Sequence, residues 1–213
     1  MLPRVVLHNE VSVDGRMAGF SSNMGLYYEL ASRWEADAML AGNTMFAAYP
    51  PEEETPEEEA FEPPELHPLH VPLLVVTDSR GRVRNWRRAQ REPYWRDIVG
   101  LCSHNTPKNY LDYLQKRRID YIVAGGDHVD LRRALEELNA RYGVKLVRVD
   151  SGGVLNGVLL RAGLVDEVSV LFYPSLVGGT TPSSIFRAPD LTSPEGAIQL
   201  RLTHVENVEG DIV

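Results

Sequence analysis

Three junctions between a predicted strand and the element after it carry small and polar residues. They read Gly42-Asn43-Thr44, Gly125-Gly126-Asp127 and Asp150-Ser151-Gly152-Gly153. Glycine lets a ligand approach the backbone closely, and the free N–H groups at the start of a helix favour phosphate. One glycine after a strand is usually only a turn. Three such junctions, in a chain without G-x-G-x-x-G, predict a dinucleotide site that is not of the Rossmann type.

A run of arginines follows another predicted strand. Thr77-Asp78-Ser79-Arg80 comes directly after the strand, and from Arg80 to Arg96 the only acidic residue is Glu92. The seven arginines of this stretch are Arg80, Arg82, Arg84, Arg87, Arg88, Arg91 and Arg96. Arginine and hydroxyl groups at such a position suit the 2′-phosphate that distinguishes NADPH from NADH. The alternatives are a solvated basic loop and a loop that pairs with acidic residues elsewhere in the chain.

Nucleic-acid binding is a weaker interpretation of the same stretch. Trp86, Tyr94 and Trp95 lie among the arginines, as in many nucleic-acid sites. The remainder of the chain, however, provides no basic face that would extend the stretch. We therefore expect no nucleic-acid partner.

Polar residues also emerge from the first predicted strand, in the run from Asn9 to Arg16. Alternation along a strand places Asn9 on one face and Ser12, with Asp14, on the other. Such groups beside a glycine turn suit hydrogen bonding to a heterocycle or a sugar. The alternative is that Asp14-Gly15 is only a turn. His8, on the same strand, is better explained as a core histidine than as a catalyst.

The pattern of apolar residues predicts the elements that position these groups. Strands alternate with helices of about ten residues, which indicates βαβ units and a mostly parallel sheet with helices on both faces. Only a loop separates the last two strands, so an antiparallel C-terminal edge is expected. The expected strands are 4–12, 37–42, 73–77, 98–103, 119–124, 144–149, 165–173 and 198–205. The expected helices lie around 27–34, after Thr106-Pro107 with a hydroxyl N-cap, at 129–142 and at 154–162.

The negative charge of the chain belongs to one segment. Eight glutamates fall between Pro50 and Glu65, and removing them from the 30 acidic residues leaves 22, against 22 lysines and arginines. Six prolines between Pro50 and Pro68 forbid a regular helix or a central strand there. We predict an acidic Pro/Glu-rich surface loop at about 50–68 within a single domain, 1–213. A partner-binding acidic segment is the alternative.

Composition limits the compartment and the metals. Cys102 is the only cysteine, which excludes a disulfide framework and a multi-cysteine zinc site within one chain. We therefore expect no bound metal. No apolar run approaches the about 18 residues of a membrane helix, and no signal-peptide pattern is found. These observations predict a cytoplasmic protein without a membrane partner.

Taken together, the motifs resemble a known family. Asn9…Ser12-Val13-Asp14-Gly15-Arg16, Ala36 to Thr44, and Val149-Asp150-Ser151-Gly152-Gly153-Val154-Leu155-Asn156-Gly157 occur in order, followed by Leu159 to Glu167 and Pro174…Gly178-Gly179. This series is similar to the reductase domain of riboflavin biosynthesis, within the dihydrofolate-reductase-like superfamily. The likeness extends over nearly the whole chain, from about Val5 to Val205.

The resemblance implies an activity. The family uses NADPH to reduce the ribosyl group of 2,5-diamino-6-ribosylamino-4(3H)-pyrimidinone 5′-phosphate to ribityl. It implies that Asn9, Ser12 and Arg16 bind this phosphorylated pyrimidine, and that Asp14 and Asp150 orient or polarise it. With the junction motifs, the residues expected to bind NADPH are Gly42, Thr44, Thr77, Asp78, Ser79, Arg80, Ala124, Gly125, Gly126, Ser151, Gly152, Gly153 and Val154. The P-C-x-x-C element of the deaminase domain in bifunctional relatives is absent.

The chain departs from the family's usual motifs at two places, and two rival functions are left open. The family usually has a glutamate and three glycines where this chain has Asp150-Ser151-Gly152-Gly153, and the turn before Thr44 is one residue shorter than usual. The rivals are a reductase of another pterin, imine or carbonyl on the same fold, and a non-catalytic nucleotide-binding protein. The resemblance also implies a homodimer, with Val168–Tyr173 as the candidate interface because that run is apolar on both faces.

Overall fold

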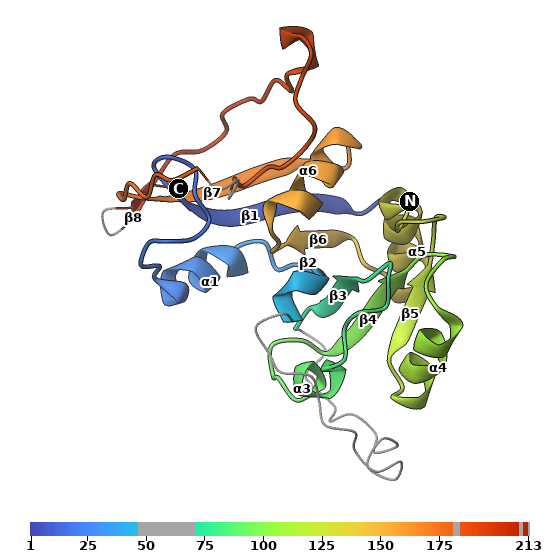
Figure 1. Ribbon diagram of the computed structural model, residues 1–213. Coiled ribbons are helices and arrows are strands. Elements are labelled where there is room, and N and C mark those ends of the chain that lie inside the picture. Colours follow the sequence, from blue (N-terminus) through green and yellow to red (C-terminus); the bar gives the residue numbers. More distant parts are fainter. Residues whose placement is uncertain (47–70, 181–183, 209–210, 213) are drawn as a thin grey trace. The chain divides into compact units, whose positions relative to one another are not determined.

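The computed structural model describes residues 1–46, 71–180, 184–208 and 211–212. The predicted acidic loop at 50–68 lies outside these residues. The chain divides into two compact units: unit 1 comprises Met1–Val5 and Trp34–Ser151, and unit 2 comprises Val6–Arg33 and Gly152–Val213. Figure 1 labels the α-helices of both and the strands β1 to β8.

Within the described residues, unit 1 contains five parallel strands. They occur in the order β5-β4-β3-β2-β6, and neighbouring strands pair in parallel throughout. Their bounds are β2 Ala38–Gly42, β3 Leu73–Thr77, β4 Asp97–Cys102, β5 Asp120–Val123 and β6 Leu146–Val149. The helices of unit 1 are η1 Asn43–Phe46, α3 Trp86–Gln90, α4 Lys108–Lys116 and α5 Leu131–Tyr142. Because all five strands are parallel, the loops after them open at one edge of the sheet.

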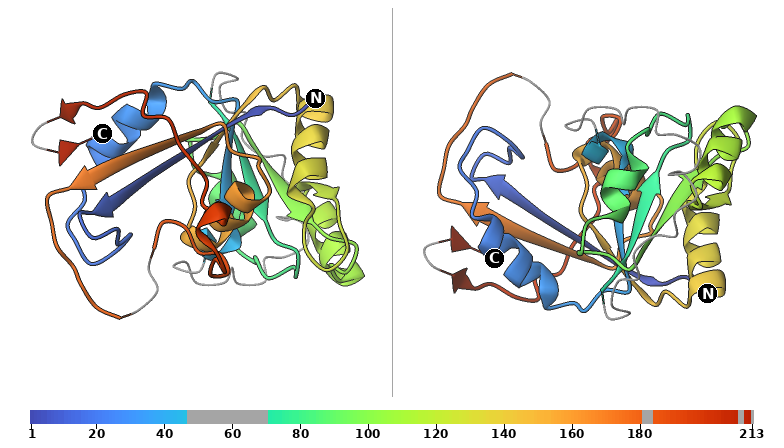
Figure 2. Two further views of the ribbon diagram at one scale, coloured as in Figure 1. Left: turned by 90° about the horizontal axis from the view of Figure 1, so that it is seen from above. Right: turned by 90° about the horizontal axis from the view of Figure 1, so that it is seen from below.

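Both faces of the unit 1 strands are buried, as their continuous apolar sequences require. One set of alternate residues packs with Trp86 of α3 and with Tyr110 and Leu114 of α4 in one cluster. The strand residues of this cluster are Met39, Ala41, Leu74, Val76, Ile98 and Cys102. The other set, which includes Leu40 and Val75, is fully buried as well. Figure 2 shows α5 across these strands from α3.

Unit 2 contains the remaining strands. β1 (Arg4–Ser12), which begins in unit 1, pairs in parallel with β7 (Glu167–Tyr173), and β7 pairs antiparallel with β9 (Asp211–Ile212). β8 (Asn207–Val208) pairs antiparallel with β9, and η2 is Pro194–Gly196. The helices are α1 (Met24–Ser32), capped by the Asn23 side chain, and α6 (Gly153–Arg161). Leu26 and Leu30 of α1 pack against Leu171 and Tyr173 of β7.

The mostly parallel α/β arrangement with an antiparallel C-terminal edge is therefore confirmed, but one expected strand is wrong. Residues 198–205 form no strand, although their side chains alternate in polarity. The strand that pairs with the outer side of β7 is β9, through Phe172 and Ile212. Ile198, Leu200 and Leu202 remain 45%, 69% and 79% exposed.

Two smaller expectations about helices also need correction. Helix α4 begins at Lys108 with Pro107 in the N-cap position, so Thr106 is not its hydroxyl cap. The Thr106 hydroxyl instead donates to the Ser79 carbonyl, at 2.7 Å. Helix α3 was not expected in the arginine-rich stretch; in the structure it buries Trp86 and Ala89.

Candidate functional site

The loops at the carboxyl edge of unit 1 bring three of the expected cofactor residues together. Gly42 ends β2 and Ser151 follows β6, its neighbour in the sheet. A methyl group placed on Gly42 would lie 3.3 Å from the Ser151 hydroxyl and 3.6 Å from that of Thr44. Two hydroxyl groups therefore converge on a glycine whose missing side chain leaves the backbone accessible.

Asp78 and Asn43 connect the next pair of loops. Asp78 directly follows β3, and its side chain is almost completely buried. Its Oδ2 accepts hydrogen bonds from the backbone N–H groups of Arg82 and Val83, at 2.7 and 2.8 Å, and from the Tyr110 hydroxyl at 2.8 Å. Its Oδ1 accepts a bond of 3.2 Å from the Asn43 side chain. The carboxylate therefore joins the β2 and β3 loops to helix α4.

The Ser79 position connects the β3 loop to the loops after β4 and β5. The Ser79 hydroxyl accepts a bond from the backbone N–H of Val129, and its carbonyl accepts bonds from the Ser103 and Thr106 hydroxyls. Gly125 and Gly126 lie in the same network, because their carbonyls accept the backbone N–H groups of His104 and Asn105. The expected glycine junction after β5 is thus adjacent to Ser79.

The arginines of the stretch differ in their surroundings. The Arg84 guanidinium lies over the Tyr110 and Tyr113 rings and donates to the Gly81 and Val83 carbonyls. Arg96 donates to the carbonyls of Asp37 and Val71, at the opposite edge of the sheet. These two arginines support the backbone. Arg80 and Arg82 lie exposed on the turn after β3, next to Ser79.

The tight turn at 78–81 depends on a glycine. Gly81 has φ +62°, and a methyl group there would lie 2.5 Å from the Tyr110 ring. The backbone therefore adopts a left-handed conformation directly against an aromatic ring, which only glycine allows at low cost. This packing fixes the positions from which the Arg80 and Arg82 side chains extend into solvent.

Asp150 lies at the same edge of unit 1. It follows β6 directly, and its backbone N–H bonds to the carbonyl of Leu40 in β2. Its side chain is partly exposed. Its expected contact with the substrate stays a prediction.

In unit 2, Ser12, Asp14 and Arg16 lie together after β1. The Asp14 carboxylate accepts the Ser12 hydroxyl at 2.6 Å and the backbone N–H groups of Val177 and Gly178 at 3.1 and 2.7 Å. The Arg16 Nε lies 3.8 Å from it. The hydrogen bonds from Ser12, Val177 and Gly178 lower the pKa of Asp14 to about 2. Asp14 is therefore ionised at neutral pH and cannot donate a proton there.

Asn9 lies on the opposite face of β1 from these groups. It is buried, and its side-chain oxygen accepts a 2.8 Å bond from Asn156 of α6. Asn156 also donates to the Ile185 carbonyl. Asn9 is thus part of the packing of unit 2, while its expected contact with substrate stays a prediction.

The start of helix α6 contains the expected glycines Gly152 and Gly153. Gly152 is the N-cap in extended conformation, and the exposed Val154 follows Gly153. The backbone of 184–187 passes close to this helix: the Arg187 N–H donates to the Gly153 carbonyl at 2.8 Å. A methyl group on Gly153 or Gly157 would overlap the carbonyls of Ser184 or Arg187, respectively. Close approach of another backbone explains both glycines, and any role in cofactor binding stays a prediction.

Sequence reasoning missed the residues that connect these loops. Asn43 was part of a recognised junction, but nothing in its spacing indicated a bond to Asp78. Tyr110, Ser103 and Thr106 were placed only as helix or strand residues. Their signal would have been burial of polar groups, which periodicity alone does not reveal.

The structure defines the protein as an α/β protein with polar residues at the strand ends of unit 1. A family model described as the RibD C-terminal domain matches residues 3–213. The chain belongs to this family.

Two curated relatives cover nearly the whole chain. The 2,5-diamino-6-ribosylamino-4(3H)-pyrimidinone 5′-phosphate reductase of Methanothermobacter thermautotrophicus is 27% identical over 222 aligned positions, which cover 100% of this chain and 97% of that protein. The protein of the same name from Aquifex aeolicus is 25% identical, over 94% of this chain and 89% of its own length.

Solved structures confirm the dihydrofolate-reductase-like fold. Acinetobacter baumannii RibD superposes with a TM-score of 0.71 at 20% identity; the match covers 99% of this chain but only 56% of that longer protein. The riboflavin biosynthesis reductase Rib7 of Saccharomyces cerevisiae gives a TM-score of 0.68 at 17% identity, covering 99% and 87% of the two chains. Among the residues that the structure describes, no helix is long and apolar enough to cross a membrane.

Proposed function

We propose that this protein, as one reductase domain over 1–213, reduces the ribosyl group of 2,5-diamino-6-ribosylamino-4(3H)-pyrimidinone 5′-phosphate to ribityl with NADPH as reductant. The observation that carries the proposal is the end-to-end match to the Methanothermobacter reductase of that name. The polar groups at the strand ends of unit 1 support it, because a reductase must hold a dinucleotide and a sugar phosphate. The protein would act in the cytoplasm on this small molecule, without nucleic acid.

The residues at the carboxyl edge of unit 1 fit NADPH in their chemistry. NADPH would supply the hydride that reduces the ribosyl carbon. Arg80 and Arg82 are exposed beside the Ser79 hydroxyl, and two guanidinium groups with a hydroxyl suit a 2′-phosphate. The Thr44 and Ser151 hydroxyls around Gly42 would bind a polar part of the same cofactor.

The two expected catalytic carboxylates differ in what they can do. Asp14 is ionised and already hydrogen-bonded by Ser12, Val177 and Gly178, so it would orient the β1 loop and Arg16 toward substrate. Asp150 is partly exposed at the strand ends, so its carboxylate would orient the substrate directly. Stabilising charge and fixing position would then account for most of the catalysis.

The test is a pair of titrations with NADPH and NADH, followed by intrinsic tryptophan fluorescence. The proposal predicts tighter binding of NADPH, because only NADPH carries the phosphate for Arg80 and Arg82. Replacing both arginines by glutamine should remove the preference and leave NADH binding nearly unchanged. Equal affinity of the wild-type protein for both cofactors would contradict the assignment.

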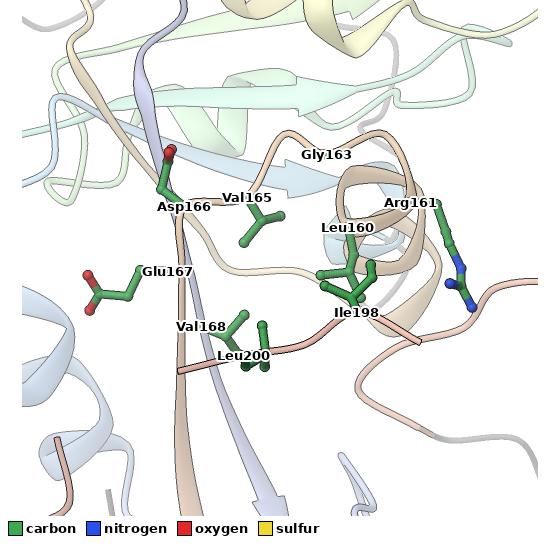
Figure 3. A pocket seen from close by; sticks show the side chains of 9 residues that line it. All are labelled: Leu160, Arg161, Gly163, Val165, Asp166, Glu167, Val168, Ile198 and Leu200. Carbon is green, nitrogen blue, oxygen red and sulfur yellow. The ribbon is translucent and has the colours of Figure 1, made fainter. Parts of the chain in front are cut away.

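We also propose a homodimer, formed through an apolar surface of unit 2. Leu160 of α6, Val168 of β7, Ile198 and Leu200 line an open cavity of about 360 Å³, with Arg161 at its rim (Figure 3). Phe172 of β7 is 39% exposed, and Leu202 is 79% exposed. Exposed apolar surface of this extent is typical of interaction sites. A second copy is the proposed occupant, since one self-complementary surface closes a twofold dimer.

Light scattering at micromolar concentration tests the dimer. A mass of about twice 23.9 kDa is expected. A monomer at that concentration would contradict the proposal without affecting the proposed reaction.

A further inference from the structure

The buried carboxylate of Asp78 has no direct route to a ligand, yet it contacts two loops that carry expected cofactor residues. Its side chain is 1% exposed, and all four of its hydrogen-bond donors belong to the protein. Two donors are backbone N–H groups of the arginine turn, one is the Asn43 side chain on the β2 turn, and one is Tyr110 on α4.

We propose that Asp78 is a positioning residue for the cofactor: it fixes the arginine turn at 79–83 relative to the Gly42-Asn43-Thr44 turn, and so sets the preference for NADPH. This inference rests on the proposed function. It assigns Asp78 a role through other residues instead of a direct contact with the dinucleotide.

The four hydrogen-bond donors around Asp78 explain why a carboxylate is needed at this position. Oδ2 accepts three hydrogen bonds and Oδ1 accepts one, and an ionised carboxylate offers acceptors only. An asparagine would place an N–H₂ donor against at least one of these donors. With the amide nitrogen in place of Oδ1, it opposes the Asn43 N–H₂ and the connection to the β2 turn is weakened; in place of Oδ2, it leaves the Arg82 and Val83 backbone N–H groups without their acceptor.

The Tyr110 side chain holds the carboxylate from the other side. Its hydroxyl donates to Asp78 and accepts a 3.0 Å bond from the Trp86 indole N–H, while its ring packs on Gly81. Burial and the nearby Asp78 charge raise the pKa of Tyr110 strongly, so the hydroxyl keeps its proton and stays a donor. Tyr110 therefore contacts the turn that carries Arg80 and Arg82 at two points, Asp78 and Gly81.

Bonds inside unit 1 therefore extend from the β2 turn to helix α4. Asn43 lies between Gly42 and Thr44, the two residues whose surroundings suit a polar part of the cofactor. The bond from Asn43 to Asp78 is the direct side-chain connection between that turn and the arginine turn. Removing either end should loosen the turn that discriminates the 2′-phosphate more than it affects binding of the common part of the dinucleotide.

The test compares Asp78→Asn and Asn43→Ala with the control Asp37→Asn. Like Asp78, Asp37 lies directly beside a strand of unit 1, and its carboxylate accepts two backbone N–H bonds, from Lys145 and Leu146 at 2.8 and 2.9 Å. Asp37, however, precedes β2 and therefore lies at the opposite edge of the sheet. For each variant, the Kd for NADPH and for NADH and the melting temperature are measured. The control should lose stability and keep the wild-type NADPH-to-NADH ratio.

We expect Asp78→Asn to weaken NADPH binding about tenfold or more and NADH binding by less than about threefold, because one or two hydrogen bonds that fix the turn are lost. Asn43→Ala should shift the ratio of NADPH to NADH affinity in the same direction by about threefold. If Asp78→Asn fails to fold, the result for Asn43→Ala tests the inference. Equal weakening of both cofactors in the folded variants, as for a purely structural residue, would overturn the inference alone. A wild-type protein that binds neither cofactor would overturn the proposed function, and this inference with it.

Discussion

Unit 1 and unit 2 bury their apolar residues to very different degrees. Among the described residues, 30 of the 41 buried hydrophobic side chains belong to unit 1, while 13 of the 15 large hydrophobic side chains that are exposed belong to unit 2. In unit 1 the strands alternate with helices that cover both faces. In unit 2 the described residues from 174 onward contribute only η2, β8 and β9 as regular structure. The comparison teaches that unit 1 holds most of the apolar core among the described residues, whereas unit 2 leaves many large apolar side chains exposed.

The largest effect should follow from opening the core of unit 1. Trp86 is fully buried and donates to Tyr110, so Trp86→Ala should lower the free energy of unfolding by about 3–5 kcal/mol. Leu202→Ala in unit 2, at a side chain that is 79% exposed, should change it by less than about 0.5 kcal/mol at concentrations where the protein is monomeric. Urea unfolding measures both. Similar losses in the two variants would show that the contrast between the units is wrong.

The second prediction concerns the carboxylate at the strand ends of unit 1. Asp150→Asn should lower kcat/KM by about 10- to 1000-fold, or about 1.4–4 kcal/mol of transition-state stabilisation, because the substrate loses an orienting charge. NADPH affinity should change little, since the backbone of the turn remains. Asp150→Glu should retain more activity than the asparagine variant. Wild-type turnover with weakened NADPH binding would instead make Asp150 a brace of the cofactor turn.

The exposed surface of unit 2 gives the third prediction. Leu200→Asp places a charge beside the cavity between α6 and β7, where the proposed dimer would bury it without a partner. The dimer should dissociate at least tenfold more readily, as measured by sedimentation over a dilution series. Leu176→Asp, at a side chain 81% exposed and away from the lining of the cavity, is the control. An unchanged dimer in Leu200→Asp would exclude this surface as the interface.

The smallest effect is expected from Asp14. Its folded pKa, about 2, lies below the ordinary 3.8, so its ionised form stabilises the folded state above about pH 4. That contribution is lost as the pH falls from about 4 to about 2. Asp14→Asn should therefore reduce stability at pH 7 slightly and remove part of the acid-induced loss. Parallel pH–stability curves for the two proteins would show that the contacts with Val177 and Gly178 do not form.

Much of unit 1 was predictable from the sequence, because apolar runs bounded by glycine and proline define its strands. The expected strand at 73–77 coincides with β3, and the expected helix at 129–142 contains α5. The expected strand at 198–205 failed for a physical reason: alternation predicts a strand only where a neighbour supplies hydrogen bonds, and β9 pairs with β7 instead. The polarity pattern of a segment does not reveal which segment pairs with the edge strand of a sheet.

The positions of the candidate residues in the fold were more predictable than the contacts among them. Thr44, Ser79, Arg80 and Asp150 fall at strand ends, as expected from a parallel sheet. The sequence could not show that Asp78 turns inward while Arg80 turns outward, because adjacent residues of a turn follow no simple periodicity. The bond between Asn43 and Asp78 connects residues 35 positions apart, which only the fold brings together.

Turnover of the proposed substrate tests the central claim most directly. Purified protein is mixed with 2,5-diamino-6-ribosylamino-4(3H)-pyrimidinone 5′-phosphate and NADPH, and the oxidation of NADPH is followed beside the product mass. The account predicts one NADPH oxidised for each substrate that gains two hydrogen atoms, with little reaction when NADH replaces NADPH. A protein that binds NADPH but leaves both the cofactor and the pyrimidine unchanged would contradict it.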